Sequence, residues 1–156
     1  MIRVDSNAFS IREFCISDYD AALALWQSAE GVGLNESDTK SAIAAFLKRN
    51  PGLSFVATEK NKIVGTALCG HDGRRGYLHH LAVAKQNRKI GIGKALIEAC
   101  LTALRRNAIP KCNIFLFSTN REGKAFWTQN GWRHRDDLEV LQKAIEIKPS
   151  EFPEPD

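Results

Sequence analysis

Three short runs rich in β-branched and aromatic residues follow one another between residues 53 and 83. The runs are LSFVATE, KIVGTALCG and YLHHLAV, separated by a polar turn at Lys60-Asn61 and by the turn HDGRRG. Turns this short join antiparallel neighbours, because a parallel pair needs a crossover connection of a dozen or more residues. The sequence therefore predicts an antiparallel meander in the middle of the chain.

Helical and further strand patterns flank this meander and predict one mixed α/β sheet, mostly antiparallel, with helices packed on it. The expected order is β-α-α-β-β-β-α-β-α-β, with no internal repeat. The 112–118 run CNIFLFS is continuously apolar, which is typical of a strand covered on both faces. In chain order the other expected elements are a strand at 10–15, a helix from a capping box at Ser17 and Asp20 to about Glu30, a helix with Ile43, Phe46 and Leu47 on its apolar stripe that stops at Asn50, a helix from about Gly93 to Asn107, a helix from Asn120 to Asn130, and a last strand at 138–147.

The length of 156 residues suits one domain with a single core, which we place at 1–148, followed by an acidic, proline-containing tail at 149–156. Hydrophobic residues make up 44% and charged residues 26% of the chain, as in soluble globular proteins. No apolar run approaches about 18 residues, and no signal pattern follows Met1. We therefore expect a cytoplasmic protein with no membrane partner.

The four cysteines form no CxxC pair and have no metal-ligand spacing, so we expect reduced thiols and no metal. We give Cys112 little weight as a nucleophile. The net charge is +4, and because the tail contributes three negative charges, the rest of the chain carries +7. A basic body can attract an anionic ligand, nucleic acid or an acidic surface, and the charge alone does not decide among them.

A basic, glycine-containing loop follows the third run of the meander and leads into a helical pattern. A Walker loop is excluded because Arg88 stands where its first glycine belongs and Ala95 where its Ser or Thr belongs. A dinucleotide fingerprint is excluded because Leu96 stands where its third glycine belongs. The remaining pattern, Arg88-x-x-Gly91-x-Gly93, can place backbone N–H groups and a helix N-terminus around a pyrophosphate. A solvated basic turn is the alternative.

The loop resembles that of the GNAT superfamily of acetyl-CoA-dependent N-acetyltransferases, and it looks most like small, single-domain bacterial members. The LAV before it and the stretch NREGKAFWTQNGW after the next strand support the same resemblance, which covers residues 10–145. The predicted element order also fits. The matching positions are Val83, Arg88, Gly91, Gly93, Asn120, Trp127, Gly131 and Trp132.

The resemblance implies where acetyl-CoA would bind, with no metal. The pantetheine arm would pair like an extra strand with the backbone of Leu81, Ala82 and Val83, and Asn120 would lie near the cofactor. The thioester would enter where the sheet splays between the strands at 77–83 and 112–118. The pyrophosphate would lie on the amides of Arg88, Lys89, Ile90, Gly91, Ile92, Gly93 and Lys94.

The resemblance also implies direct attack of an acceptor amine on the thioester, which requires a base, an oxyanion donor and a proton for the thiolate. The family supplies the oxyanion donor from the backbone N–H at the place of Val83. The base in our interpretation is His79, with Tyr77 on the same face, because YLHHLAV is similar to the strand of serotonin N-acetyltransferase whose histidines assist deprotonation. Strand alternation places Leu81 and Val83 on that face too, and His80 on the other. A hydrogen-bonded core histidine is the alternative for His79.

One position departs from the family pattern. Trp127 stands where the family has the tyrosine that acts as acid, and an indole N–H donates a hydrogen bond but does not release its proton at neutral pH. Trp127 would shield or hydrogen-bond the sulfur while water protonates it, or would only pack. Trp26 and the loop GVGLNESD lie where the family builds its acceptor wall. The alternative for Trp26 is that it only packs in the core. Glu30 and Glu36 are candidate charges for docking a cationic amine.

Three functions are compatible with these sequence features. The first is an N-acetyltransferase acting on a small-molecule or peptide primary amine. The second is a catalytically weak or inactive acyl-CoA-binding regulatory module, which the missing tyrosine favours. The third, nucleic-acid binding, is disfavoured because the basic residues are scattered without interleaved aromatic residues. The acceptor cannot be predicted from these residues, and a homodimer is compatible with the expected edge strands.

Overall fold

The computed structural model describes residues 9–151. The chain divides into two compact units, Met1–Phe115 and Leu116–Asp156. The first unit contains a five-stranded sheet in the order β1-β2-β3-β4-β5, in which β4 and β5 are parallel and every other pair is antiparallel. This confirms the predicted mixed, mostly antiparallel sheet. The strands are β1 (Ser10–Glu13), β2 (Phe55–Glu59), β3 (Lys62–His71), β4 (Gly76–Val83) and β5 (Cys112–Ile114).

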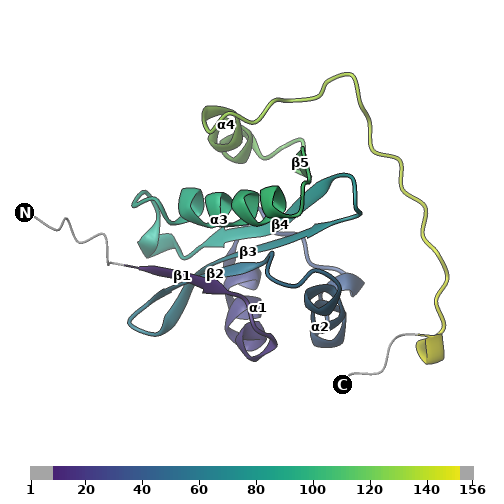
Figure 1. Ribbon diagram of the computed structural model, residues 1–156, viewed down its shortest axis with the longest axis horizontal. Coiled ribbons are helices and arrows are strands. Elements are labelled where there is room, and N and C mark those ends of the chain that lie inside the picture. Colours follow the sequence, from purple (N-terminus) through teal and green to yellow (C-terminus); the bar gives the residue numbers. More distant parts are fainter. Residues whose placement is uncertain (1–8, 152–156) are drawn as a thin grey trace, which may run out of the picture. The chain divides into compact units, whose positions relative to one another are not determined.

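Helices cover both faces of this sheet. Figure 1 shows α1 (Tyr19–Ser28) and α2 (Lys40–Arg49) on one face and α3 (Ile92–Arg106) on the other. Short 3-10 turns lie at Ile16–Asp18 (η1), Glu36–Asp38 (η2) and Lys85–Asn87 (η3). The core on the α1 face centres on Trp26, which is fully buried and packs with Phe14 and Tyr19.

The meander forms as the sequence predicts, and its first turn has a specific backbone requirement. Lys60 and Asn61 have φ angles of 49° and 64°, both in the left-handed region. Two consecutive left-handed residues define the type I′ turn, whose twist matches that of a hairpin. The predicted hairpin is therefore confirmed, with an asparagine in a conformation that asparagine tolerates well.

The predicted start of the first helix is wrong. The helix begins at Tyr19, and the carboxylate that organises the turn is that of Asp18 rather than a Ser17–Asp20 pair. Asp18 accepts a hydrogen bond from the N–H of Cys15 at 2.9 Å and two from the Arg12 guanidinium, each at 2.8 Å. Residues 14 and 15 belong to the turn rather than to β1, because that turn ends the strand at Glu13.

Two predicted strands differ from the structure. The 112–118 run forms a strand only over Cys112–Ile114, and Phe115 is exposed, so this strand is not covered on both faces along its length. Residues 138–147 form no strand and run as an extended chain with their large apolar side chains exposed (Figure 1). A strand exists only where its backbone pairs with a neighbour, and among the described residues this segment has no ladder partner.

The second unit contains α4 (Arg121–Gln129) and the short turn η4 (Pro149–Glu151). In that turn, Glu151 accepts a hydrogen bond from the N–H of Lys148 at 2.7 Å. The remainder of the predicted acidic tail, 152–156, lies outside the described residues. The domain boundary at residue 148 stays a prediction.

Three of the four cysteines are buried or half-buried, and only Cys15 is exposed. Hydrogen bonding to Cys100 raises the pKa of Cys69, and burial raises it further. Hydrogen bonding to Cys69, followed by burial, raises the pKa of Cys112. These thiols stay protonated at neutral pH, which argues against Cys112 as a nucleophile because the thiolate is the reactive form.

We expect Asp18→Asn to lower the free energy of unfolding by roughly 1 kcal/mol, a modest value because the Arg12 side chain is 47% exposed. The hydrogen bonds from Arg12 hold the pKa of Asp18 below its ordinary value. Its contribution is therefore complete above that ordinary value and is lost as the pH falls through the lower, folded-state value. Urea unfolding at pH 7 and at about pH 3 measures both effects. An equal loss in the exposed control Asp136→Asn would contradict this role.

Candidate functional site

The two histidines of β4 lie on the same face of the sheet, because the strand contains a β-bulge. Leu68 pairs with His79 and Thr66 pairs with Ala82, so a step of two residues on β3 opposes a step of three on β4. His80 is the extra residue of the bulge, and its backbone has a left-handed φ of 49°. The alternation of side chains between the two faces of the sheet therefore shifts by one residue at that point. The prediction that His80 lies opposite His79 is therefore wrong.

The same shift moves Leu81 and Val83 away from the face of His79. Val83 lies opposite Gly65, and a Cβ at Gly65 would meet Ile92 and Leu96 of α3. Val83 therefore belongs to the α3 face. The ring of His79 instead lies 6.3 Å from Phe46 of α2, and that of His80 lies 4.8 Å from Trp26 of α1.

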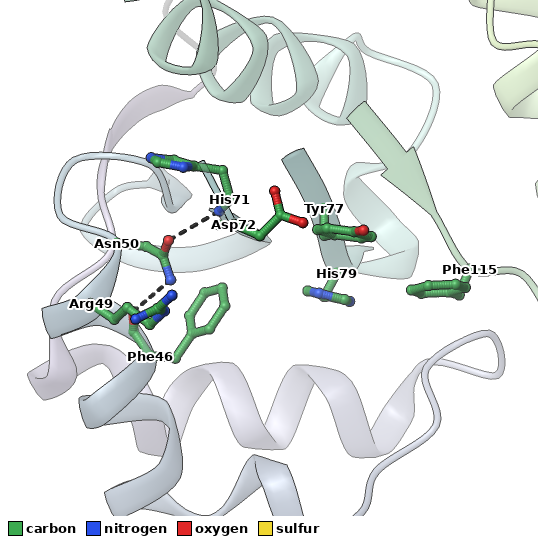
Figure 2. A pocket seen from close by; sticks show the side chains of 9 residues that line it. Phe46, Arg49, Asn50, His71, Asp72, Tyr77, His79 and Phe115 are labelled. Carbon is green, nitrogen blue, oxygen red and sulfur yellow. Dashed lines mark hydrogen bonds between the residues drawn. The ribbon is translucent and has the colours of Figure 1, made fainter. Parts of the chain in front are cut away.

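His79 and Tyr77 line one pocket of about 370 Å³, shown in Figure 2. Both rings stack on Phe115, at centroid distances of 6.4 Å and 6.1 Å, and Phe46 closes the other side of His79. Two charged side chains, Arg49 and Asp72, also line the pocket. The structure thus brings the two predicted strand residues together with aromatic and charged side chains that the sequence did not single out as site residues. These come from α2, from the turn between β3 and β4 and from the residue that follows β5.

The environment of His79 favours its neutral form. Burial is the main cause that lowers the pKa of His79, the charge of His80 lowers it further, and Asp38 partly opposes both. A neutral imidazole has one nitrogen free to accept a proton. His79 can therefore act as a base at neutral pH.

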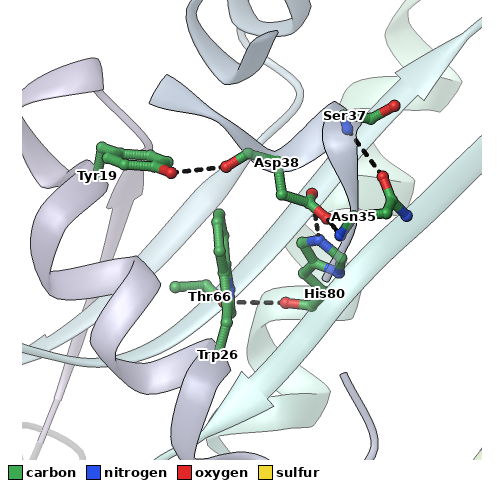
Figure 3. A network of polar contacts seen from close by, with 7 residues as sticks. All are labelled: Tyr19, Trp26, Asn35, Ser37, Asp38, Thr66 and His80. Carbon is green, nitrogen blue, oxygen red and sulfur yellow. Dashed lines mark hydrogen bonds and ion pairs between the residues drawn. The ribbon is translucent and has the colours of Figure 1, made fainter. Parts of the chain in front are cut away.

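A second polar cluster lies beside this pocket (Figure 3). His80 Nε2 lies 2.6 Å from Asp38 Oδ1, and the Tyr19 hydroxyl donates to the Asp38 carbonyl at 2.6 Å. The Trp26 indole donates to the Thr66 hydroxyl at 2.8 Å, which donates in turn to the His80 carbonyl at 2.9 Å. Trp26 is thus a core residue beneath the site. Glu30, just after α1, and Glu36, the first residue of η2, are both exposed.

Among the described residues of the first unit, the edge of β4 toward β5 has no ladder partner over its second half and is open there. The β4–β5 pairing ends at Leu78 and Ile114, whereas β4 continues to Val83. The N–H of Ala84 donates to the carbonyl of Val64 at 2.8 Å, so Val83, one residue earlier, turns its N–H and C=O away from β3 toward the open side. Arg88 Nε reaches the Val83 carbonyl at 3.2 Å.

The basic loop continues directly from this open edge into α3. Its start is anchored because the Asn87 side chain donates to the Glu59 carboxylate at the end of β2. Lys89 and Gly91 have left-handed φ angles of 67° and 91°, and the space around a Cβ at Gly91 is empty, so backbone conformation rather than crowding favours glycine there.

The N-terminus of α3 has the chemistry of an anion site. The first intrahelical hydrogen bond of α3 runs from the N–H of Ala95 to the carbonyl of Gly91, at 3.0 Å. The N–H groups at 92–94 therefore precede the intrahelical ladder. Four exposed basic side chains surround them, and such a terminus attracts phosphate groups. These side chains are Lys85, Arg88, Lys89 and Lys94.

The second unit holds the two other predicted site residues. Asn120 caps α4, accepting from the N–H of Gly123 at 2.9 Å, as predicted from its position. Trp127 is 6% exposed and packs edge-on against Phe126 and Trp132, with centroid distances of 5.5 Å and 4.8 Å. Within this unit Trp127 is a core residue, and the roles of both residues toward a cofactor stay predictions.

Residues 19–132 match the acetyltransferase (GNAT) family. The chain belongs to this family. It is an acetyltransferase of the GNAT type, and the GNAT fold implies acetyl-CoA as co-substrate. Among the described residues, no helix is long and apolar enough to cross a lipid bilayer.

Solved structures share the GNAT fold at low sequence identity. PaiA N-acetyltransferase from Thermoplasma acidophilum, in complex with coenzyme A, has a TM-score of 0.73 and 17% identity over 82% of this chain and 91% of that chain. Ard1 from Thermoplasma volcanium has a TM-score of 0.71 and 22% identity over 80% and 82%. An aminoglycoside acetyltransferase from an uncultured soil metagenomic sample, in complex with sisomicin, has a TM-score of 0.70 and 18% identity over 92% and 99%.

The contact between Gly65 and the first turn of α3 yields a prediction. A Cβ at Gly65 would lie 2.9 Å from Ile92 Cγ2 and 3.1 Å from Leu96 Cδ1. We expect Gly65→Ala to lower the free energy of unfolding by about 1–3 kcal/mol through overpacking, and to speed amide exchange in the first turn of α3. Chemical denaturation and hydrogen exchange measure these effects. An equal loss in the exposed-loop control Gly33→Ala would contradict the packing argument.

Proposed function

We propose that the protein transfers the acetyl group of acetyl-CoA to a primary amine by direct attack in a ternary complex, without an acyl-enzyme. The observation that carries this proposal is the open edge of β4. It leads directly from Val83 through a basic loop to the free N–H groups of α3. A single stretch of chain thus offers strand-like pairing for an amide-containing arm, followed by an anion site for a pyrophosphate.

The cofactor would lie along this stretch. The pantetheine amides would pair with the backbone of 81–83 along the open edge of β4. The pyrophosphate would accept hydrogen bonds from the amides of 88–94. Arg88 would serve two purposes, since its Nε already braces the Val83 carbonyl and its terminal nitrogens remain for phosphate.

The acceptor would be a small molecule or a peptide amine in the pocket of Tyr77 and His79. The pocket opens on the helical face that also carries the Asp38–His80 pair. A structural relative is an aminoglycoside acetyltransferase solved with sisomicin, which supports a small-molecule acceptor. Phe46, Tyr77 and Phe115 would contact apolar parts of such a molecule, and Asp72 would attract a cationic group.

The catalytic roles follow from the same geometry. His79 would accept a proton from the nitrogen of the acceptor as the new amide bond forms, directly or through a water molecule, while Tyr77 shapes the pocket beside it. The N–H of Val83 would stabilise the tetrahedral oxyanion, because it points to the open side where the thioester would enter. Trp127 would shield or hydrogen-bond the sulfur, and water would protonate the departing thiolate.

A regulatory acyl-CoA-binding module is the second candidate. Trp127, in the place of the family's acidic tyrosine, favours it, because the indole is packed against Trp132 and does not release a proton at neutral pH. A product assay with a panel of primary amines separates the two functions. Acetylated product identifies the enzyme, whereas cofactor binding without any product identifies the module.

Thermal unfolding with acetyl-CoA, with ATP and NAD as controls, tests the proposed binding site. At about 100 times its dissociation constant, a specific ligand adds ~2.7 kcal/mol, which raises Tm by about 5–10 °C for a chain of this size. We expect this shift with acetyl-CoA alone. No shift at millimolar acetyl-CoA would show that the loop is only a basic turn.

We expect His79→Ala to lower kcat roughly 10²–10⁴-fold, as removal of a general base does. Because burial lowers the pKa of His79, the acid limb of the wild-type pH–rate profile should lie below the ordinary histidine value of 6.5. Steady-state kinetics with the best amine of the panel measures both. The exposed His134→Ala is the matched control. An unchanged rate in His79→Ala would remove this residue from the mechanism.

A further inference from the structure

Asp38 and His80 form a nearly buried pair that the roles above leave unused. Their Oδ1 and Nε2 atoms are 2.6 Å apart, and the exposed fractions of the two side chains are 9% and 14%. Asp38 Oδ2 also accepts from the N–H of Asn35, at 3.0 Å. Burying a carboxylate is costly unless hydrogen bonds satisfy it, so this pair is a specific arrangement rather than a surface contact.

The position of the His80 ring is fixed from several directions (Figure 3). Its face packs on Trp26, and its carbonyl accepts from Thr66, which is itself held by the Trp26 indole. The left-handed φ of 49° costs a non-glycine residue on the order of 1–3 kcal/mol. Such strain persists only where the surroundings determine it, and it is common at functional sites.

The pair leaves one nitrogen of the His80 ring available. The carboxylate of Asp38 accepts a hydrogen, so Nε2 is assigned as the N–H and Nδ1 carries the lone pair. Within residues 9–151, Nδ1 has no hydrogen-bond partner, and no buried side-chain nitrogen or oxygen lacks one. Nδ1 is therefore open to solvent or to a ligand. A histidine with one nitrogen oriented by a carboxylate and the other free has the arrangement of a general base.

The proposed reaction needs two deprotonations. An alkyl amine arrives as an ammonium ion because its pKa is near ~10. It loses one proton before it can attack the thioester, and the nitrogen of the tetrahedral intermediate loses another. The departing thiolate takes up one proton, so one proton is released to solvent in each turnover. A single histidine would have to discharge between the two steps, whereas two histidines on one face would not.

We propose that His80, oriented by Asp38, is the base that takes the first proton from the acceptor's ammonium group. The inference rests on the proposed function. The N–H bond of the ammonium breaks, a new N–H bond forms at Nδ1, and the charge of the imidazolium is held by Asp38. The proton then leaves through Nδ1 to solvent. His79 takes the second proton, from the nitrogen of the tetrahedral intermediate.

The position of His80 supports these separate roles for the two histidines. His80 immediately precedes Leu81, where the proposed pantetheine pairing begins, and its ring lies on the helical face that also carries the ring of His79. The titratable and charged groups that face His80 are Asp38 on η2, Tyr19 on α1 through the Asp38 carbonyl, and His79 on its own strand. Asp38 is the one anion among them, and its carboxylate orients the His80 ring.

The first test needs no acceptor. Nitrogen NMR of the full chain, with and without acetyl-CoA, assigns the tautomer of His80. We expect the neutral ring to carry its hydrogen on Nε2, and Asp38→Asn to weaken that preference. A neutral ring that carries its hydrogen on Nδ1 would overturn the proposal, because no lone pair would then face the site.

The second test uses the pH dependence of acetylation of the best panel amine. His80→Gln keeps a side-chain N–H donor for Asp38 but removes the basic Nδ1. We expect it to lower kcat/KM about 10²–10⁴-fold at pH 7. The deficit should shrink to within about tenfold near pH 10, where about half of the amine arrives already unprotonated. His79→Ala should keep its deficit at both values, because the second deprotonation is still required.

Matched controls separate this proposal from a structural role. Asp38→Asn should lower the rate at pH 7 and, because the charge of Asp38 raises the pKa of His79, should also move the acid limb to lower pH. His134→Gln and Asp136→Asn, on exposed residues of the second unit, should change neither. Each variant is first checked for an unchanged thermal shift with acetyl-CoA. A His80→Gln deficit that is equal at pH 7 and pH 10, or absent, would overturn the role of His80. Loss of the wild-type thermal shift or product would instead contradict the proposed function itself.

Discussion

The constraint on which the site depends is that β4 cannot alternate regularly along its whole length. The extra residue at His80 turns both histidines toward α1 and α2, and it lets Val83 face α3 with its N–H toward the open edge. Without the bulge, one histidine would lie under α3, away from the pocket. The Thr66 hydroxyl, bonded to the His80 carbonyl, holds the bulge in place.

The site has two parts, one built from a continuous stretch of sequence and one built from separate segments. The proposed cofactor stretch is continuous in sequence, and its affinity for an anion comes from backbone groups and from the start of α3. The acceptor face is assembled from separate segments: α2 contributes Phe46, η2 contributes Asp38, and Phe115 follows directly after β5. Family membership therefore determines the first part more closely than the second, in which the specificity for the acceptor would reside.

Local patterns predicted much of the fold. The hairpin at Lys60-Asn61, the stop of α2 at Asn50 and the cap at Asn120 were all predicted because each depends on neighbours within a few residues. The predictions failed where the outcome depends on distant partners. The apolar run after Cys112 pairs for three residues only, and 138–147 form no strand, because a strand requires a paired edge that sequence alternation does not supply.

The sequence by itself determined the order of elements as far as α4, the basic loop with glycine at position 91, and the candidate residues on β4. These follow from turn chemistry, hydrophobic period and motif spacing. Only the tertiary structure decided that His80 shares a face with His79 and that it meets Asp38, 42 residues away in the chain. The physical reason is that a bulge arises from the register of two strands, and a buried hydrogen-bonded pair from the packing of a loop against them. Neither has a signature in local sequence.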